Sequence, residues 1–207
     1  MSRQINNLYQ LFPKKIRLFC FFLIPLLLFL QSKPLLARNS KPNTNNPWQY
    51  ASFPVENFQA FTSGFGYRIS PVTNQWQFHY GLDLAAPYGS YVRNWWSGKV
   101  VELSDNTGCG TMIKIESGRW QHVYCHLIGK VQDLPNGRRY LLDSEGGIML
   151  TLGQTISYGT RIARVGVSGN TTGPHLHWGI KFDGQYIDPS LVIQEMYKNQ
   201  VAKANHR

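Results

Sequence analysis

The chain has 207 residues and a formal net charge of +10, from 21 Lys and Arg against 11 Asp and Glu. This length suits one well-packed domain with extensions and is short for two full domains. Residues 1–37 contain five of the basic residues and no acid, so the remainder carries 16 basic and 11 acidic residues and a net charge of +5. These charges are spread along the chain, which argues against nucleic acid as a partner and suits an anionic matrix such as a bacterial wall.

The N-terminal segment, residues 1–37, has the pattern of a targeting sequence. Lys14, Lys15 and Arg17 precede an apolar run over residues 18–30. A basic start followed by about 7 to 15 apolar residues is typical of a secretory signal, whereas a membrane span takes about 20 residues. We therefore expect export to the periplasm or the cell wall. The match to a cleavage site is poor, so an uncleaved membrane anchor through residues 18–30 stays open.

Beyond this segment the pattern predicts a linker, one domain and a tail. Residues 38–49 are rich in Asn, Pro and Ser and predict a solvated linker. Residues 50–190 hold short β-like runs between turn residues and predict a mainly β domain, in which residues 132–147 form a surface insertion. Residues 191–207 predict a short helical C-terminal tail. The predicted strands are residues 99–103, 111–116, 120–127, 160–166 and 175–182.

The cysteines suggest a disulfide. Cys20 lies in the apolar run, so cleavage would leave Cys109 and Cys125 as an even pair in an oxidising compartment. Residues 116–119 predict a hairpin turn. With residues 117 and 118 at the tip of the hairpin, the residue numbers of two paired positions add up to about 235. This register sets Cys109 nearly opposite Cys125. We predict a disulfide, the alternative being two small buried residues.

Two of the six histidines, His175 and His177, stand one residue apart in the stretch GPHLHWG. On a strand, residues i and i+2 share one face, so both imidazoles are expected to point the same way. Neutral imidazole is the commonest metal ligand and a frequent proton carrier near neutral pH. The pair therefore indicates a metal site, catalysis or both, against the alternative of two half-buried strand histidines.

A second cluster, FHYGLDL, sets His79 four residues before Asp83. Four residues of straight strand span about 13 Å, so the chain must bend for both side chains to hold one ion, and Gly81 lies where that bend is needed. Two imidazoles and one carboxylate are a common ligand set for catalytic zinc. The same set describes the facial triad of non-haem iron oxygenases, and no HExxH motif is present.

A third stretch, HVYCHL, contains His122, Tyr124 and His126. Strand alternation puts the three side chains on one face, so either histidine can face the site. The spacing does not choose between them.

Three stretches together, TSGFGYRISPVTNQWQFHYGLDLAAPYGS, WQHVYCHL and VGVSGNTTGPHLHWGI, resemble the lysostaphin-type, or LytM-type, zinc endopeptidases that cut bacterial peptidoglycan. The resemblance extends over about residues 61–189. It implies an antiparallel β-sheet scaffold, the duplicated hybrid motif of barrel or sandwich type, with a groove over one zinc ion. The implied zinc ligands are His79, Asp83 and His177. The residues implied to act on the water and the scissile carbonyl are His126 and His175.

Some positions depart from the family or have no counterpart in it. His122 matches no catalytic position of the family and is left as a strand residue that is a candidate for a role in the groove. The chain has Trp178-Gly179 where the family commonly has Phe-Glu, and Trp95-Trp96 where it has small residues. These tryptophans are candidates to reshape the groove, although core packing is the expected role for any one of them.

The resulting expectation is an exported zinc metalloendopeptidase that hydrolyses peptide bonds in peptidoglycan stem peptides or cross-bridges. One alternative is a catalytically inactive relative that binds the wall or activates an amidase. Another is a non-haem iron oxygenase.

Overall fold

The computed structural model describes residues 51–204. The predicted signal or anchor segment 1–37, the linker 38–49 and the last residues of the tail, 205–207, lie outside the described residues. Among residues 51–204, no helix combines the length and the apolar character needed to cross a membrane.

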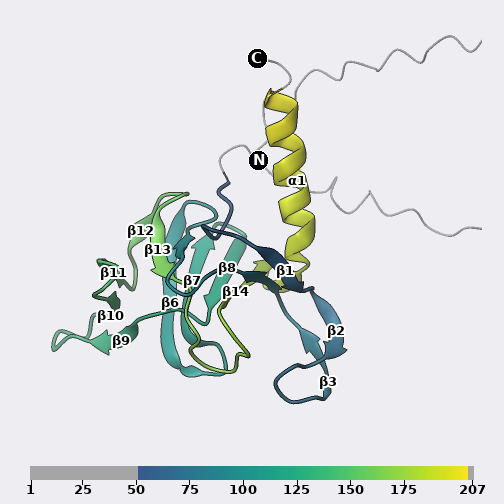
Figure 1. Ribbon diagram of the computed structural model, residues 1–207. Coiled ribbons are helices and arrows are strands. Elements are labelled where there is room, and N and C mark those ends of the chain that lie inside the picture. The colour runs from purple at the N-terminus through teal and green to yellow at the C-terminus, as the bar shows by residue number, and fades with distance from the viewer. Residues whose placement is uncertain (1–50, 205–207) are drawn as a thin grey trace, which may run out of the picture. The chain divides into compact units, whose positions relative to one another are not determined.

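An eight-stranded sheet forms the centre of the fold, and its paired strands are antiparallel (Figure 1). The strand order is β1-β4-β14-β8-β7-β6-β12, and β15 pairs with β14 off this path. The strands of this sheet are β1 (Ala60–Ser63), β4 (Leu82–Ala85), β6 (Gly98–Thr107), β7 (Gly110–Ser117), β8 (Trp120–Cys125), β12 (Thr155–Ile156), β14 (His175–Phe182) and β15 (Gln185–Ile187).

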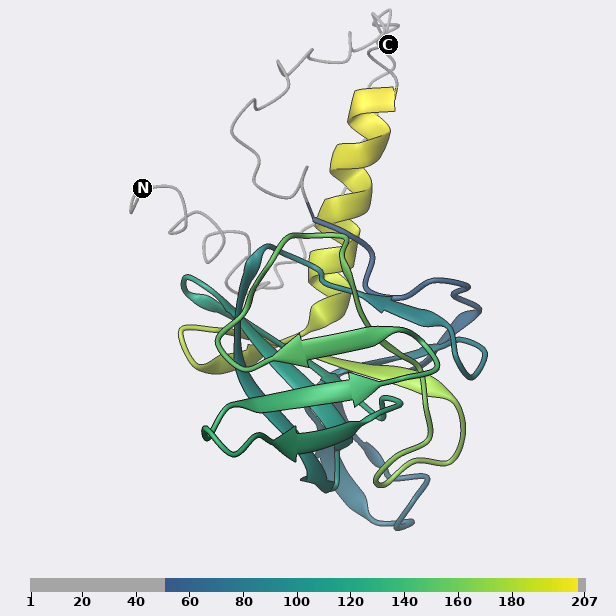
Figure 2. The same cartoon turned by 90° about the vertical axis from the view of Figure 1, so that its left-hand side faces the viewer.

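Three smaller antiparallel sheets accompany the central one. Figure 2 shows the three-stranded sheet β11-β10-β9 in front of the central sheet. The fold is mainly β with antiparallel sheets, so the predicted fold class is confirmed. The strands of the smaller sheets are β2 (Gly66–Ile69), β3 (Trp76–His79), β5 (Tyr91–Arg93), β9 (Lys130–Asp133), β10 (Arg139–Asp143), β11 (Ile148–Thr151) and β13 (Arg161–Arg164).

Strand β14 separates the hydrophobic core from the polar face of the central sheet. Leu176, Trp178 and Ile180 are fully buried on one face. His175 and His177 alternate with them and therefore lie on the other face. The apolar residues of this strand thus fix the core and present both histidines on the opposite side.

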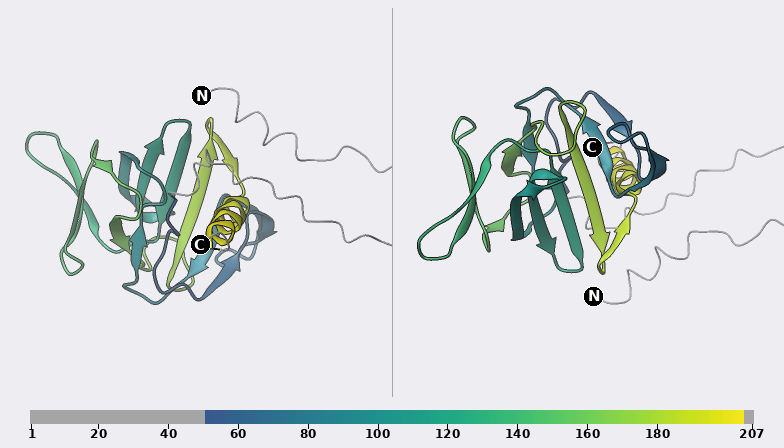
Figure 3. Two further views of the ribbon diagram at one scale, coloured as in Figure 1. Left: turned by 90° about the horizontal axis from the view of Figure 1, so that it is seen from above. Right: turned by 90° about the horizontal axis from the view of Figure 1, so that it is seen from below.

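The predicted C-terminal helix is present as α1 (Pro189–Ala204). Pro189 occupies the first helical position, where its missing N–H costs nothing, and the Asp188 carboxylate accepts a hydrogen bond from the Ser190 N–H at 2.8 Å. Met196 is buried against the core, and the Trp95 indole N–H donates to its sulfur at 3.2 Å. In both views of Figure 3, the helix and the sheet β11-β10-β9 lie on opposite sides of the central sheet.

The predicted surface insertion, residues 132–147, contributes ordered structure. It contains the end of β9 and all of β10, and Leu141 of β10 is fully buried in the main core. The Asp143 carboxylate pairs with the Arg164 guanidinium at 2.6 Å. The segment is therefore attached to the core through β10.

The hairpin β7–β8 differs in register from the prediction. Ser117 pairs with Trp120, so the turn is made by residues 118 and 119, with Gly118 at a φ of 65°. This turn is one residue later than predicted, because a glycine supplies the positive φ that a tight hairpin needs. Ladder pairing consequently does not set Cys109 opposite Cys125.

The structure nevertheless joins Cys109 and Cys125 in a disulfide, with their Cα atoms 4.9 Å apart. Cys109 precedes the first residue of β7, in the turn that links β6 to β7. This turn, rather than the hairpin register, brings Cys109 beside Cys125.

Candidate metal centre

His177 and Asp83 come from adjacent strands of the central sheet. The two residues are direct partners in the antiparallel pair of β14 and β4. Partners in such a pair present their side chains on the same face, a few ångströms apart. The Nδ1 atom of His177 lies 2.9 Å from Oδ1 of Asp83.

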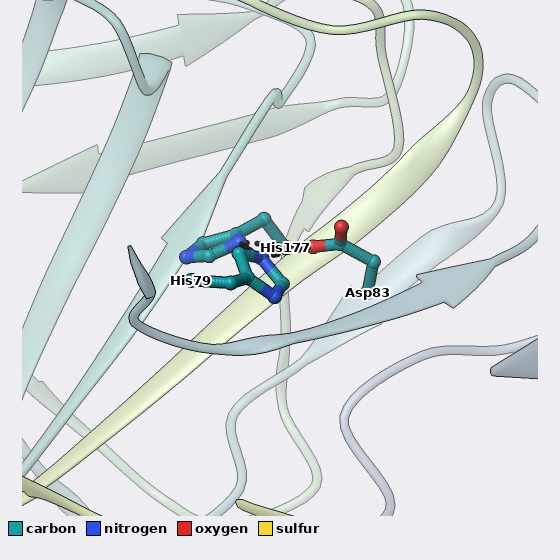
Figure 4. Close-up of side chains that lie close together, drawn as sticks. All are labelled: His79, Asp83 and His177. Atoms are coloured by element: carbon teal, nitrogen blue, oxygen red, sulfur yellow. Dashed lines mark hydrogen bonds and ion pairs between the residues drawn. The ribbon is translucent and has the colours of Figure 1, made fainter. Parts of the chain in front are cut away.

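His79 joins them from the end of β3. The chain bends at Gly81 before β4 begins, as the spacing of His79 and Asp83 requires. The Nε2 atom of His79 then lies 2.9 Å from Nδ1 of His177 and 3.1 Å from Oδ1 of Asp83. Figure 4 shows the three side chains pointing toward one another. Segments nearly one hundred residues apart therefore meet at one point.

Gly81 allows the His177 ring to reach this position. A Cβ atom at residue 81 would lie 2.6 Å from Cε1 and 2.7 Å from Nε2 of His177. Such distances are far inside van der Waals contact, so a larger residue would displace the ring. The motif HxxxD therefore supplies the side chains of His79 and Asp83 and, through Gly81, the space that the His177 ring occupies.

The three atoms are spaced as metal ligands are. Zinc holds nitrogen and oxygen ligands at about 2.0–2.2 Å in a tetrahedron, which puts neighbouring ligand atoms about 3.3 Å apart. The observed separations of 2.9 to 3.1 Å are close to that value. An expansion of the triangle by a few tenths of an ångström would accommodate the ion.

Proton counting is also compatible with a cation at this point. The Nδ1 atom of His79 lies 2.7 Å from the carbonyl oxygen of Gly64, so Nδ1 carries the proton and donates. In the neutral ring, Nε2 then offers only a lone pair to the Asp83 carboxylate. A hydrogen bond there needs a second ring proton, and a metal cation can take its place. These residues therefore fit a divalent metal ion.

The electrostatic environment favours the metal-binding protonation states. Burial raises the pKa of Asp83, but its contacts with His177 and His79 outweigh burial and hold the pKa well below its usual range. Burial lowers the pKa of His177, which keeps its imidazole neutral near pH 7. An ionised carboxylate and a neutral imidazole are the forms that bind a metal.

His175 and His126 lie next to this group. Nδ1 of His175 donates to the carbonyl oxygen of Gly173 at 2.9 Å, and its Nε2 lies 3.7 Å from Oδ1 of Asp83. Nδ1 of His126 donates to the carbonyl oxygen of Ser168 at 2.8 Å. The two rings are 4.8 Å apart between centroids. In each ring, therefore, Nε2 is the nitrogen that does not donate to the backbone.

The backbone of His126 explains how its ring reaches the site. His126 follows the last residue of β8 and has a φ of 62°, a left-handed conformation that residues other than glycine seldom adopt. Its N–H donates to the carbonyl oxygen of Cys109 at 2.8 Å. Cys109 therefore holds Cys125 through the disulfide and His126 through this hydrogen bond. Burial, followed by the neighbouring His175 and His177, lowers the pKa of His126 to about 4 despite its hydrogen bond to Ser168.

His122 faces the core, so the predicted groove role for this residue is wrong. Its Nδ1 contacts the Tyr124 hydroxyl at 2.7 Å, its Nε2 contacts the Ser117 hydroxyl at 2.9 Å, and its ring packs against Trp95. The alternation of side chains along β8 puts His122 and Tyr124 on the core face. His126 lies beyond the end of β8, so its side chain does not follow this alternation. The two histidines consequently point to opposite sides of the sheet.

Trp95 and Trp178 have the core-packing role expected for a single tryptophan, and among the described residues that line the groove neither is present. Both side chains are fully buried, and their rings pack 5.7 Å apart. Trp178 is adjacent to His177 on β14 and therefore lies on the core face. Trp96 is partly buried against the same core and does not line the groove within the described part of the chain.

The candidate metal ligands His79, Asp83 and His177 and the two flanking histidines open into a groove of about 580 Å³. Its walls come from the hairpin β2–β3, from residues 170–172 and from Tyr186 of β15. Sequence reasoning did not single out Arg68, Thr171 or Tyr186 as groove residues. Arg68 lies in the first stretch that resembles the zinc endopeptidases, but only its contact with the site distinguishes it from other surface arginines.

The described residues thus combine a mainly β scaffold with two histidines and one aspartate that lie in a groove and could hold a metal ion. These features are those of a metal-dependent enzyme of the mainly β class. The model of Peptidase family M23 matches residues 77–189, and the chain belongs to this family. The recognised resemblance to lysostaphin-type and LytM-type enzymes is thereby confirmed.

Known proteins and solved structures share the matched region. A DD-carboxypeptidase/endopeptidase, Mpg, of Neisseria meningitidis serogroup B is 30% identical over 65% of this chain and 27% of its own length. The crystal structure of a zinc-containing peptidase from Vibrio cholerae is 29% identical over 67% of this chain and 38% of that chain, with a TM-score of 0.53. The catalytic domain of lysostaphin from Staphylococcus simulans is 23% identical over 67% of this chain and 93% of that chain, with a TM-score of 0.50, and shares the fold. The chain spans about a quarter of the length of the curated relative.

Proposed function

We propose that this chain is a zinc metalloendopeptidase that hydrolyses peptide bonds in peptidoglycan stem peptides or cross-bridges. The convergence of His79 Nε2, Asp83 Oδ1 and His177 Nδ1 carries the proposal, because three ligand atoms this close together can share one cation. Membership of Peptidase family M23 supports peptide hydrolysis. The name of a related protein from Vibrio cholerae, peptidoglycan DD-endopeptidase ShyB, supports peptidoglycan peptides as the substrate class.

The proposed zinc ligands are His79, Asp83 and His177. Zinc held by two imidazoles and one carboxylate acts as a Lewis acid and makes water acidic near neutral pH. The hydrogen bond from His79 Nδ1 to the Gly64 carbonyl fixes the ring so that Nε2 faces the ion. This chain therefore supplies both the ligands and the contact that orients one of them.

His126 and His175 are the proposed catalytic residues. Each ring donates through Nδ1 to a backbone carbonyl, which leaves Nε2 to accept a proton from the attacking water. Once protonated, the same Nε2 can return the proton to the leaving amine or donate a hydrogen bond to the developing oxyanion. The low pKa of His126 keeps its ring neutral and able to accept before the reaction.

We further propose that residues 1–37 direct export and that residues 50–190 form the peptidase domain, followed by the tail 191–207. The substrate lies outside the cytoplasm, so a secretory signal or an anchor through residues 18–30 would deliver the domain to it. The disulfide between Cys109 and Cys125 is consistent with an oxidising compartment.

Metal analysis and a sacculus assay test the proposal together. The purified protein should contain one zinc per chain, reduce the turbidity of purified sacculi and release muropeptides whose masses identify the cleaved bond. A chelator or the substitution His79→Ala should abolish the turbidity loss, and zinc should restore activity only after chelation. Zinc without hydrolysis would instead indicate a wall-binding or amidase-activating relative, and iron with oxygen-dependent turnover would indicate an oxygenase.

A further inference from the structure

Arg68 lines the groove on the same side of the hairpin β2–β3 as the metal centre. In this hairpin Arg68 pairs with Gln77 and Gly66 pairs with His79. Because side chains alternate along a strand, Arg68 and Gln77 lie on the face that carries His79. About a quarter of the Arg68 side chain, 24%, is exposed. The guanidinium therefore borders both the groove and the metal ligands.

The hydrogen-bonding capacity of Arg68 is largely unused. Within residues 51–204, the buried Nε and Nη1 atoms have no hydrogen-bond partner. Nη2 lies 3.8 Å from Oδ2 of Asp83, which is beyond hydrogen-bonding distance. A buried donor without a partner is costly, so the guanidinium would be stabilised by an acceptor that reaches these atoms.

Asp83 is poorly placed to be that acceptor. Its Oδ1 atom already lies within 3.1 Å of both His79 and His177. With a cation bound there, the charge of Asp83 is committed to the metal centre. Among the described residues that line the groove, Asp83 is the only Asp or Glu, and Arg68 is the only Arg or Lys. The positive charge of Arg68 is thus available to an anion in the groove.

We propose that Arg68 binds a free carboxylate of the peptide substrate and so selects peptides that carry this group next to the cleaved bond. The inference rests on the proposed function and narrows its substrate class. A planar guanidinium matches the two oxygens of a carboxylate, and rotation of the side chain toward the groove would pair its unpartnered donors with those oxygens. Asp83 remains beside Arg68 and limits how far the group moves.

Binding of two matched peptides tests this role separately from hydrolysis. The peptides are cross-linked stem peptides that differ only in one group beside the scissile bond, a free carboxylate in one and its primary amide in the other. Binding is measured with the zinc-loaded His175→Ala protein, which keeps the proposed zinc ligands and lacks a proposed catalytic imidazole. The carboxylate peptide should bind about tenfold to a hundredfold more tightly than the amide, as expected for a hydrogen bond to a charged group.

Three further variants in the same background identify the source of the preference. Arg68→Gln should bind both peptides with similar affinity, and Arg68→Lys should keep part of the preference because it retains the charge without the planar fork. Arg138→Gln, which makes the same chemical change at an exposed residue outside the groove, should keep the full preference. Zinc content is measured for each protein.

Several outcomes would overturn the proposal. These are equal binding of the two peptides by the parent protein, an unchanged preference in Arg68→Gln, or an equal loss of both affinities accompanied by loss of zinc. The last result would mean that Arg68 serves only to position Asp83. Failure of the proposed function has a different signature, since a protein with an intact His175 would then leave sacculi uncleaved whatever the peptide preference.

Discussion

The substitution Gly81→Ala tests whether the position of the His177 ring controls the metal centre. The new Cβ would lie 2.6 Å from Cε1 of His177 and 2.8 Å from the carbonyl oxygen of Trp178. Non-bonded carbon atoms are normally about 3.5–4.0 Å apart, so one of these groups must move by about 1 Å. The Trp178 backbone is held between β4 and β8 on either side, and therefore the His177 ring is the group expected to move.

A displacement of this size should weaken metal binding much more than it weakens folding. Metal–ligand distances vary by only about 0.2 Å, so a ligand moved by about 1 Å no longer fits the ion. We expect zinc affinity to fall roughly 10- to 100-fold or more, the range seen when groups that orient a ligand are removed. Crowding should lower the free energy of unfolding by about 1–3 kcal/mol.

Zinc affinity is measured by competition with a chelating dye, and stability by urea denaturation of the metal-free protein. Gly64→Ala is the matched control, because no atom lies within 4 Å of its new Cβ and its carbonyl can still accept from His79. The control should bind zinc like the unmodified protein. If Gly81→Ala also kept that affinity, within about threefold, the assignment of His177 as a ligand in this ring position would be wrong.

Three further substitutions test other parts of the site and fold. His175→Ala should retain one zinc per chain while hydrolysis falls by about 10²–10⁴-fold in a sacculus assay, and loss of zinc would show that the roles of the two strand histidines are reversed. Replacing Cys109 and Cys125 by Ser should lower the free energy of unfolding in urea by about 3 kcal/mol, since the bridge closes a loop with a sequence separation of 16, and unchanged stability would refute this. Burial lowers the pKa of His122 to about 3 against an ordinary value of 6.5, so between these pH values the unfolded chain binds more protons than the folded one. Stability of the metal-free protein should therefore fall as the pH decreases through this window, by up to about 1.4 kcal/mol per pH unit. His122→Phe should remove that part of the slope in urea titrations, and parallel pH profiles for the two proteins would contradict the prediction.

The sequence determined the groups that meet at the site more completely than it determined their surroundings. The pair His175 and His177 can be assigned to one face because a strand has a side-chain period of two, and the bend at Gly81 follows from the reach needed between His79 and Asp83. The strand at residues 175–182 was predicted with the bounds that the structure gives it. The resemblance to a known family then supplied a role for four of the six histidines, leaving out His122 and His206.

Tertiary structure decided which side of each strand faces the groove. Periodicity groups His122 with His126, but the left-handed backbone at His126 breaks the alternation where β8 ends. Periodicity likewise does not decide which face of β14 is buried in the core. Packing against Trp95 puts Trp178, and with it that face, in the core. These outcomes depend on contacts between distant segments, which local spacing does not encode.

The same limit applies to Arg68 and to the disulfide. Nothing in the spacing around Arg68 relates it to Asp83, which lies on a different strand, and their proximity arises only when β2 of the hairpin β2–β3 comes close to β4 of the central sheet. The pairing of Cys109 with Cys125 was predicted from a hairpin register that is off by two in the sum of paired positions, whereas the bridge depends on the turn between β6 and β7. The sequence by itself therefore determined the chemistry of the proposed ligands, because the residue types and the alternation of side chains along a strand can be read from residues close together in the chain. Only the tertiary structure decided the walls of the groove, because those walls are made by segments that have no fixed relation along the chain.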